Sequence, residues 1–241
     1  SFAEFAAYKL GVSSKKAELE LSDNRFKTER IIKEYFSYGG YPAVVLAEKE
    51  KRKLELLKEI YKSYLEKDIQ LLLGVEKGWA FEALVRILAG KTGQIVNRAE
   101  LASTCGINEK TVEKYLFFLE KTFIISVARP FFRNARKEMV KSPKIYFNDL
   151  GFLSLAKGRF GAPDIEGDVF ENACFLRLKE LELLESVKYW RSSAGAEVDF
   201  VISDAKTGTV VPVEAKVSAR KGALGKSLIS FISSYKPRFA C

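Results

Sequence analysis

Two short runs near the carboxyl end of the chain alternate apolar and polar residues, and this pattern predicts two strands joined by a turn over 204–208. The runs are AEVDFVISDA and TVVPVEAKVS. Strict alternation separates two faces of the first strand, one with Val198, Phe200 and Ile202, the other with Glu197, Asp199 and Val201. On the second strand, Glu214 and Lys216 share a face. An amphipathic helix that begins at Gly167 precedes both strands and bears Glu171 near its start.

The order helix-Glu, strand-Asp, strand-Glu-x-Lys predicts a catalytic cluster of Glu171, Asp199, Glu214 and Lys216. The three carboxylates are the oxygen ligands that Mg²⁺ takes, and such an ion polarises a phosphate and acidifies a bound water. Lys216 would position that water and offset developing charge. The cluster thus predicts phosphodiester hydrolysis. An ordinary hairpin with solvated charges is the alternative, since Glu-x-Lys alone is a common pattern.

A helix-turn-helix pattern occupies the middle of the chain, in NRAELASTCGINEKTVEKYLFFLEKTFII. A helix over about 97–104 precedes a tight turn at Gly106 and a second helix over 109–121, for which Asn108 is a good N-cap. The small residue Ala102, four positions before the turn glycine, lets the two helices cross closely. Helix lengths, turn residue and apolar positions all agree with this motif.

A predicted hairpin follows and would be the wing of a winged helix over residues 79–150. FIISVARPF and KIYFND alternate as strands around the basic turn RNARKEMVKSP. The residues expected to contact nucleic acid are Lys110, Thr111 and Lys114 on the second helix and Arg133, Arg136, Lys137 and Lys141 on the wing. Packing against protein is the alternative, because Glu109 and Glu113 offset the lysines of the helix.

Helical spacing also predicts helices over 27–37, 49–73 and 79–90, whereas the polar stretch 13–25 suggests an exposed loop. Gly90-Lys91-Thr92 is not a phosphate loop, because that motif needs a glycine five residues earlier, after a strand. ATP binding is therefore not expected within these residues.

Composition narrows the classes of function. The absence of histidine excludes histidine-based triads and histidine-ligated zinc, and three widely spaced cysteines do not form a disulfide framework. No apolar run reaches the roughly 18–20 residues of a membrane helix, and no signal peptide is visible, so a cytoplasmic location is expected. The net charge of +9 suits DNA as a partner. The basic segment that contains the predicted hairpin would also be explained by a solvated hairpin with lysines on its edge.

The motifs occur in an order that resembles one prokaryotic family, the AAA-type ATPases that carry a carboxyl-terminal domain of unknown function numbered 4143. They are SFAEF, YGGYP, YLEKDI, the helix-turn-helix segment, KIYFND-x-G, FEN, YWR, EVDFVI and VPVEAK. The resemblance spans nearly the whole chain. It implies an upstream ATPase domain that is absent from these residues, and ATP would bind only through that domain. It also implies a winged helix followed by a PD-(D/E)XK nuclease-like fold, with Glu171, Asp199, Glu214 and Lys216 in the nuclease-like positions.

The expected architecture is α+β, with three parts. A helical linker covers 1–78, a winged helix-turn-helix covers 79–150, and an α/β restriction-endonuclease-like domain with a mixed sheet covers 160–241, with truncation of that domain as an open alternative. Two functions remain open. One is Mg²⁺-dependent DNA processing under an ATPase motor, and the other is a non-catalytic DNA- or protein-binding regulatory module. No membrane partner is expected.

Overall fold

The computed structural model describes residues 1–64, 78–132, 142–161, 165–180, 187–203, 208–218, 224–237 and 239–240. The mixed α+β class predicted from the sequence is confirmed. None of the helices within these ranges is long and apolar enough to cross a membrane. The chain forms two compact units, which are described separately. The first comprises Ser1–Gly90, Arg98–Ile124 and Phe147–Ile165, and the second comprises Lys91–Asn97, Ile125–Tyr146 and Glu166–Cys241.

The described part of the first unit is helical. Its helices are α1 (Phe2–Leu10), α2 (Ser14–Asp23), α3 (Arg25–Tyr38), α4 (Pro42–Leu46), α5 (Glu50–Ser63), α7 (Gly78–Gly90), α8 (Arg98–Cys105), α9 (Glu109–Lys121) and α11 (Leu150–Ala156). The predicted helices over 27–37 and 79–90 are confirmed. The loop expected over 13–25 is wrong, because α2 forms there and buries Ala17. The predicted helix over 49–73 is seen as α5, and its part beyond residue 64 lies outside the described residues.

Two segments far apart in the sequence meet in the first unit, at the turn after α3. Asp149 caps α11 by accepting from the backbone N–H of Phe152 at 2.8 Å, and it also accepts from the N–H of Gly40 at 2.7 Å. Gly39 has φ +76°, and a Cβ there would lie 2.2 Å from an oxygen of Asp149. Gly39 of the YGGYP motif therefore leaves room for the buried carboxylate, whereas a Cβ on Gly151 of the FND-x-G motif would lie 2.2 Å from the carbonyl oxygen of Tyr38.

The helix-turn-helix expected in the first unit is present as α8 and α9. Asn108 caps α9, since its side chain accepts from the N–H of Thr111 at 2.8 Å, and Gly106 takes φ +62° in the turn. Val112 and Leu119 of α9 are fully buried, and Tyr115 is nearly so. These features follow from local sequence, because caps and turn glycines act within a few residues.

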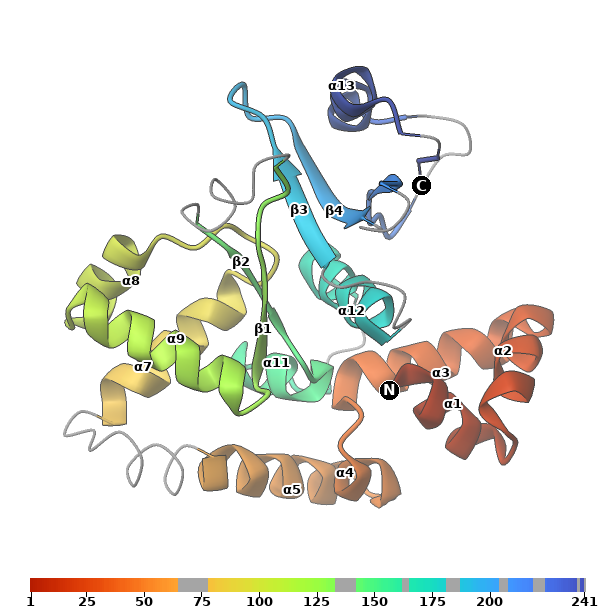
Figure 1. Cartoon of the computed structure of the whole chain (residues 1–241). Helices are drawn as coiled ribbons and strands as arrows, with labels where there is room; N and C mark the ends of the chain where they lie inside the picture. Colours follow the sequence, from red (N-terminus) through yellow and green to blue (C-terminus); the bar gives the residue numbers. More distant parts are fainter. Residues whose placement is uncertain are drawn as a thin grey trace. The chain divides into compact units, whose positions relative to one another are not determined.

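The second unit contains all of the described strands, although Phe147 at the end of β2 belongs to the first unit. β1 (Ile125–Ala128) pairs with β2 (Lys144–Phe147), and β3 (Val187–Arg191) lies beside β4 (Glu197–Ser203) (Figure 1). β5 (Val210–Val213) pairs with β4, so that β3, β4 and β5 form an antiparallel sheet in that order. Just after β1, Pro130 makes a parallel bridge to Tyr189 of β3. α12 (Gly167–Glu180) contacts β3, and α13 (Lys226–Tyr235) contacts β4 and β5. The hairpin expected as a wing thus pairs with the sheet of this unit.

Candidate functional site

A β-bulge in β4 lies at the position of the predicted catalytic aspartate. The pairing of β3 with β4 shifts by one residue between Lys188 and Trp190, so Asp199 and Phe200 together oppose the single residue Tyr189. A bulge of this kind bends the strand and changes the direction of a side chain, and bulges are common beside active sites. The direction of Asp199 is therefore set by an extra residue in the strand.

Side-chain packing shows the effect of the bulge. Val198 and Val201 both lie in an apolar cluster with residues of α13. Phe200 instead packs against Phe175 of α12, with ring centroids 6.2 Å apart. The expected strict alternation, with Val198 and Phe200 on one face and Asp199 and Val201 on the other, is therefore wrong. The bulge lets Asp199 and Phe200 both approach α12, where the charge of Asp199 also acts on Cys174.

Glu171 of α12 and Asp199 of β4 share one partly buried environment. Burial raises the pKa of Glu171, and the charge of Asp199 raises it further, whereas Lys144 opposes both effects. Burial also raises the pKa of Asp199, although its Oδ2 accepts from the backbone N–H of Ala215 at 2.9 Å. Two of the predicted catalytic carboxylates are thus close enough to interact electrostatically.

The carboxylate of Glu171 is held by two donors from strand β2. The hydroxyl of Tyr146 donates to Glu171 Oε1 at 2.7 Å, and Lys144 Nζ donates to the same oxygen at 3.2 Å. Burial raises the pKa of Tyr146 well above its ordinary value, and Glu171 contributes to this rise. The tyrosine therefore remains a neutral donor at physiological pH, and the position of Glu171 is fixed by contacts within the protein.

The segment after α7 supports the start of α12. Thr92 is fully buried, and its hydroxyl donates to the side-chain oxygen of Asn172 at 2.8 Å. Gly93, at φ +72°, donates its N–H to the carbonyl of Ile145, and a Cβ there would lie 3.0 Å from Glu171 Cδ. Thr92, from the Gly90-Lys91-Thr92 sequence, therefore holds Asn172 of α12, and the absence of a side chain at Gly93 leaves room for Glu171.

Lys144 is a central member of the site that sequence reasoning missed. Its side chain is 1% exposed, and Nζ lies 3.2 Å from Glu171 Oε1 and 2.7 Å from Glu197 Oε1. Burial alone would lower the pKa of Lys144, but Glu171 and Glu197 outweigh burial and raise it, so the ammonium stays charged. The available signal was a lysine at the head of the buried strand KIYF, where a charged residue needs a partner.

The predicted strand position of Glu214 and Lys216 is wrong, because β5 ends at Val213. Both residues lie in the segment that follows. Glu214 and Lys216 form an ion pair at 3.1 Å, in which the lysine side chain is 47% exposed. A Cβ on Gly225, the N-cap of α13, would lie 2.7 Å from Glu214 Oε2, so this carboxylate packs against the start of that helix. Glu214 still acts electrostatically on Asp199.

The arrangement of these carboxylates decides whether a magnesium ion fits. Across the residues that the structure describes, no three carboxylate, cysteine or histidine side chains are grouped as ion ligands. Glu171 and Asp199 interact electrostatically, but Glu171 is paired with the Lys144 ammonium, and Glu214 lies against Gly225 and pairs with Lys216. The described side chains therefore do not fit the predicted three-carboxylate magnesium centre, and no chemical step is assigned to an ion.

The predicted nucleic-acid residues divide into two groups. Lys110 and Lys114 are exposed on α9, whereas the hydroxyl of Thr111 donates to the N-cap Asn108 at 3.0 Å. Glu113, on the same helix, pairs with Arg98 at 3.1 Å. The four wing residues lie outside the described residues; they are Arg133, Arg136, Lys137 and Lys141.

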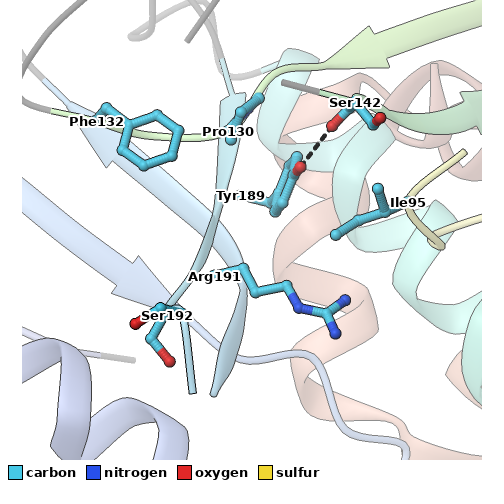
Figure 2. A pocket seen from close by; sticks show the side chains of 8 residues that line it. Ile95, Pro130, Phe132, Ser142, Tyr189, Arg191 and Ser192 are labelled. Carbon is cyan, nitrogen blue, oxygen red and sulfur yellow. Dashed lines mark hydrogen bonds between the residues drawn. The ribbon is translucent and has the colours of Figure 1, made fainter. Parts of the chain in front are cut away.

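The second unit also contains a pocket of about 390 Å³ beside β3. Figure 2 shows its lining, which combines apolar side chains with a guanidinium group and hydroxyls; it consists of Ile95, Pro130, Phe132, Ser142, Tyr189, Arg191, Ser192 and Ser193. The hydroxyl of Tyr189 donates to the carbonyl of Ser142 at 2.6 Å, and burial raises the pKa of this tyrosine to about 12. Arg191 is half exposed and lies 3.4 Å from Glu197 Oε2, so the pocket adjoins the carboxylate cluster.

Comparison with known proteins gives relatives of unknown function. The chain is 28% identical over 155 residues to an uncharacterised protein of Haemophilus influenzae, and the matched region covers 62% of the chain and 38% of that relative. It is 30% identical over 121 residues to uncharacterised proteins of Mycobacterium bovis and Mycobacterium tuberculosis, covering 48% of the chain and 27% of each relative. The chain thus spans well under half the length of these relatives. No solved structure matches it significantly.

Two family models match, and together they cover most of the chain. The model of a domain of unknown function, DUF4143, matches residues 166–241, which contain all four predicted catalytic residues. The model of a second domain of unknown function, DUF8612, matches residues 29–162, which is more than half of the chain. The chain therefore belongs to the DUF8612 family, and its carboxyl-terminal part is similar to DUF4143.

Proposed function

We propose that this chain is a non-catalytic, nucleic-acid-binding regulatory module of a larger AAA-type ATPase, with a nuclease-like second unit. The observation that carries the non-catalytic part is that each predicted catalytic carboxylate already has a donor within the protein. Glu171 accepts from Tyr146 and Lys144, Asp199 from the N–H of Ala215, and Glu214 pairs with Lys216. Carboxylates engaged in this way are poorly placed to gather around an incoming ion.

Two features support nucleic acid as the ligand. The chain carries a net charge of +9, and α9, the second helix of a helix-turn-helix, exposes Lys110 and Lys114. The pocket beside β3 offers apolar and aromatic surface next to a half-exposed guanidinium, Arg191, which suits a base with its phosphate. Much of the binding energy would come from neutralised phosphates, so affinity should fall steeply with salt.

Fluorescence anisotropy with single- and double-stranded DNA in EDTA, over a range of salt concentrations, tests binding. Replacing Arg133, Arg136 and Lys137 together by alanine should reduce the slope of log affinity against log salt by about 0.9 for each phosphate that the variant no longer neutralises. Arg191→Gln should weaken binding of single-stranded DNA, with Arg25→Gln as control, because Arg25 forms an exposed pair with Glu29 within the first unit. Absence of measurable DNA binding at low salt would overturn the proposal.

Mg²⁺-dependent DNA cleavage is the second candidate, and one observation favours it. The bulge brings Asp199 beside Glu171, and burial raises the pKa of both, as is common at catalytic sites. If this candidate holds, the full-length protein cleaves DNA with Mg²⁺, and Asp199→Ala or Glu214→Ala abolishes cleavage. Lys216→Ala would then suppress turnover and leave metal binding intact or tighter.

A protein partner in place of DNA is favoured by a different observation. Phe117 is 58% exposed on α9, where the ring lies 5.5 Å from the ammonium of Lys121. Phe117→Ser would weaken binding to a protein and leave the salt dependence of DNA binding unchanged. In the anisotropy experiment with this variant, loss of DNA affinity would assign the exposed ring to DNA binding and count against a protein partner at Phe117.

A further inference from the structure

We infer that Lys144 is the built-in cation of the carboxylate cluster, so that the chain's own ammonium holds the place that a divalent ion takes in a metal-dependent site. This inference rests on the geometry within the second unit and is independent of nucleic-acid binding. It explains why the described side chains do not fit the expected magnesium centre.

The ammonium lies between carboxylates from two different elements. Lys144 enters from β2, Glu171 from α12 and Glu197 from β4, and Nζ is 3.2 Å and 2.7 Å from their respective oxygens. Asp199 also contributes to the electrostatic field at Nζ. A divalent ion in a protein performs the same task, since it draws carboxylates from separate elements to one point.

Lys144 is the main group that neutralises the negative charges of the carboxylates around it. Glu171, Glu197 and Asp199 carry three negative charges when ionised, and Lys144 is the buried cation among them. Arg191 lies 3.4 Å from Oε2 of Glu197, the oxygen that does not contact Lys144 in this pair, and is half exposed. Removing the ammonium would leave three mutually repelling carboxylates in a partly buried site.

The aliphatic part of the Lys144 side chain is buried together with its ammonium group. The side chain of Lys144 is 1% exposed, and Nζ lies 5.6 Å from the ring centroid of Tyr189. Tyr146, two residues later on β2, donates to Glu171, so one strand supplies both donors of that carboxylate. Methionine keeps the length and apolar character of the stem, and Lys144→Met therefore removes the charge with little loss of volume.

Manganese alone is the probe, because its effect requires neither DNA nor activity. In the 241-residue chain, Mn²⁺ titrated by calorimetry should show no site in the wild type up to millimolar concentration. Lys144→Met should bind one Mn²⁺ at least about ten-fold more tightly, since coordination then relieves the repulsion of the carboxylates. Lys144→Met/Glu171→Gln should lose that gain. Lys179→Met is the matched control, because Lys179 donates to the hydroxyl of Ser126 at 2.8 Å.

Thermal unfolding keeps the inference testable if Lys144→Met is poorly folded. Bound Mn²⁺ stabilises only the folded state, so saturating ion should raise the melting temperature of Lys144→Met by about 5 °C or more and leave wild type and Lys179→Met unchanged. Two results would overturn the inference. One is a wild type that binds Mn²⁺ as tightly as Lys144→Met, and the other is a Lys144→Met variant whose melting temperature does not respond to Mn²⁺. Neither result bears on DNA binding, which is measured separately.

Discussion

Two lysines of the second unit form ion pairs of similar length, and replacing each by methionine should have very different effects on stability. Lys144 is 1% exposed and pairs with Glu171 and Glu197, which are 17% and 29% exposed. Removing one partner of a buried pair costs about 3–5 kcal/mol, and the partial exposure of Glu197 places Lys144→Met near the lower end of that range. Lys216 is 47% exposed and pairs with Glu214, so Lys216→Met should cost less than about 1 kcal/mol.

Urea denaturation followed by tryptophan fluorescence measures this difference. Trp190 is buried in the second unit, whereas Trp79 is 60% exposed in the first, so a Trp79→Phe background isolates the signal of the second unit. The cost of Lys144→Met should persist at about 1 M NaCl, because buried pairs are little screened, and Glu171→Gln should recover part of it. Equal costs for the two lysines, or a Lys144 effect that disappears in salt, would refute the reasoning.

Three further predictions concern the first unit. Gly39→Ala should destabilise it by about 3 kcal/mol or more in thermal unfolding, because the new Cβ would meet Asp149 at 2.2 Å. Gly11→Ala, at φ +66° with open space around it, is the control and should cost about 1 kcal/mol. Asn108→Ala should cost about 1 kcal/mol by removing the cap of α9, measured by urea denaturation. Burial raises the pKa of Asp149, so the folded protein binds the carboxyl proton more tightly than the unfolded chain does. The protonated carboxyl therefore stabilises the fold fully below the ordinary carboxyl pKa, and this stabilisation is lost as the pH rises through the raised pKa of the folded state. Asp149→Asn should flatten the slope of stability against pH over that acidic range.

The sequence was sufficient for features that depend on neighbouring residues. Asn108 and Gly106 act within one turn of α9, and their roles were predicted and are confirmed. The capping box of Ser1 and Glu4 at the start of α1 is also formed by residues that are close in the sequence. The order of helix and strands around Glu171 and Asp199 also followed from periodicity, because the period of an apolar pattern reports the element that carries it.

Other features depended on tertiary structure and could not be predicted. An alternating pattern does not show where an extra residue enters a strand, so the bulge at Asp199 and Phe200 placed Val201 with Val198, against the predicted alternation. Lys144 was missed because its partners are 27 and 53 positions away in the sequence, on α12 and β4. The spacing of Glu214 and Lys216 fits a strand, yet the pairing of β5 with β4 ends before them, at Val213.

We expect this chain to bind nucleic acid without cleaving it, and the carboxylate cluster of its second unit to be neutralised by Lys144 in place of a divalent ion. The most direct measurement incubates the 241-residue chain with end-labelled DNA in EDTA, in Mg²⁺ and in Mn²⁺, and follows binding and cleavage in the same samples. The expected result is binding of equal affinity in all three buffers at matched ionic strength, with the DNA intact. Cleavage that requires Mg²⁺ or Mn²⁺ and disappears in Asp199→Ala would contradict the account.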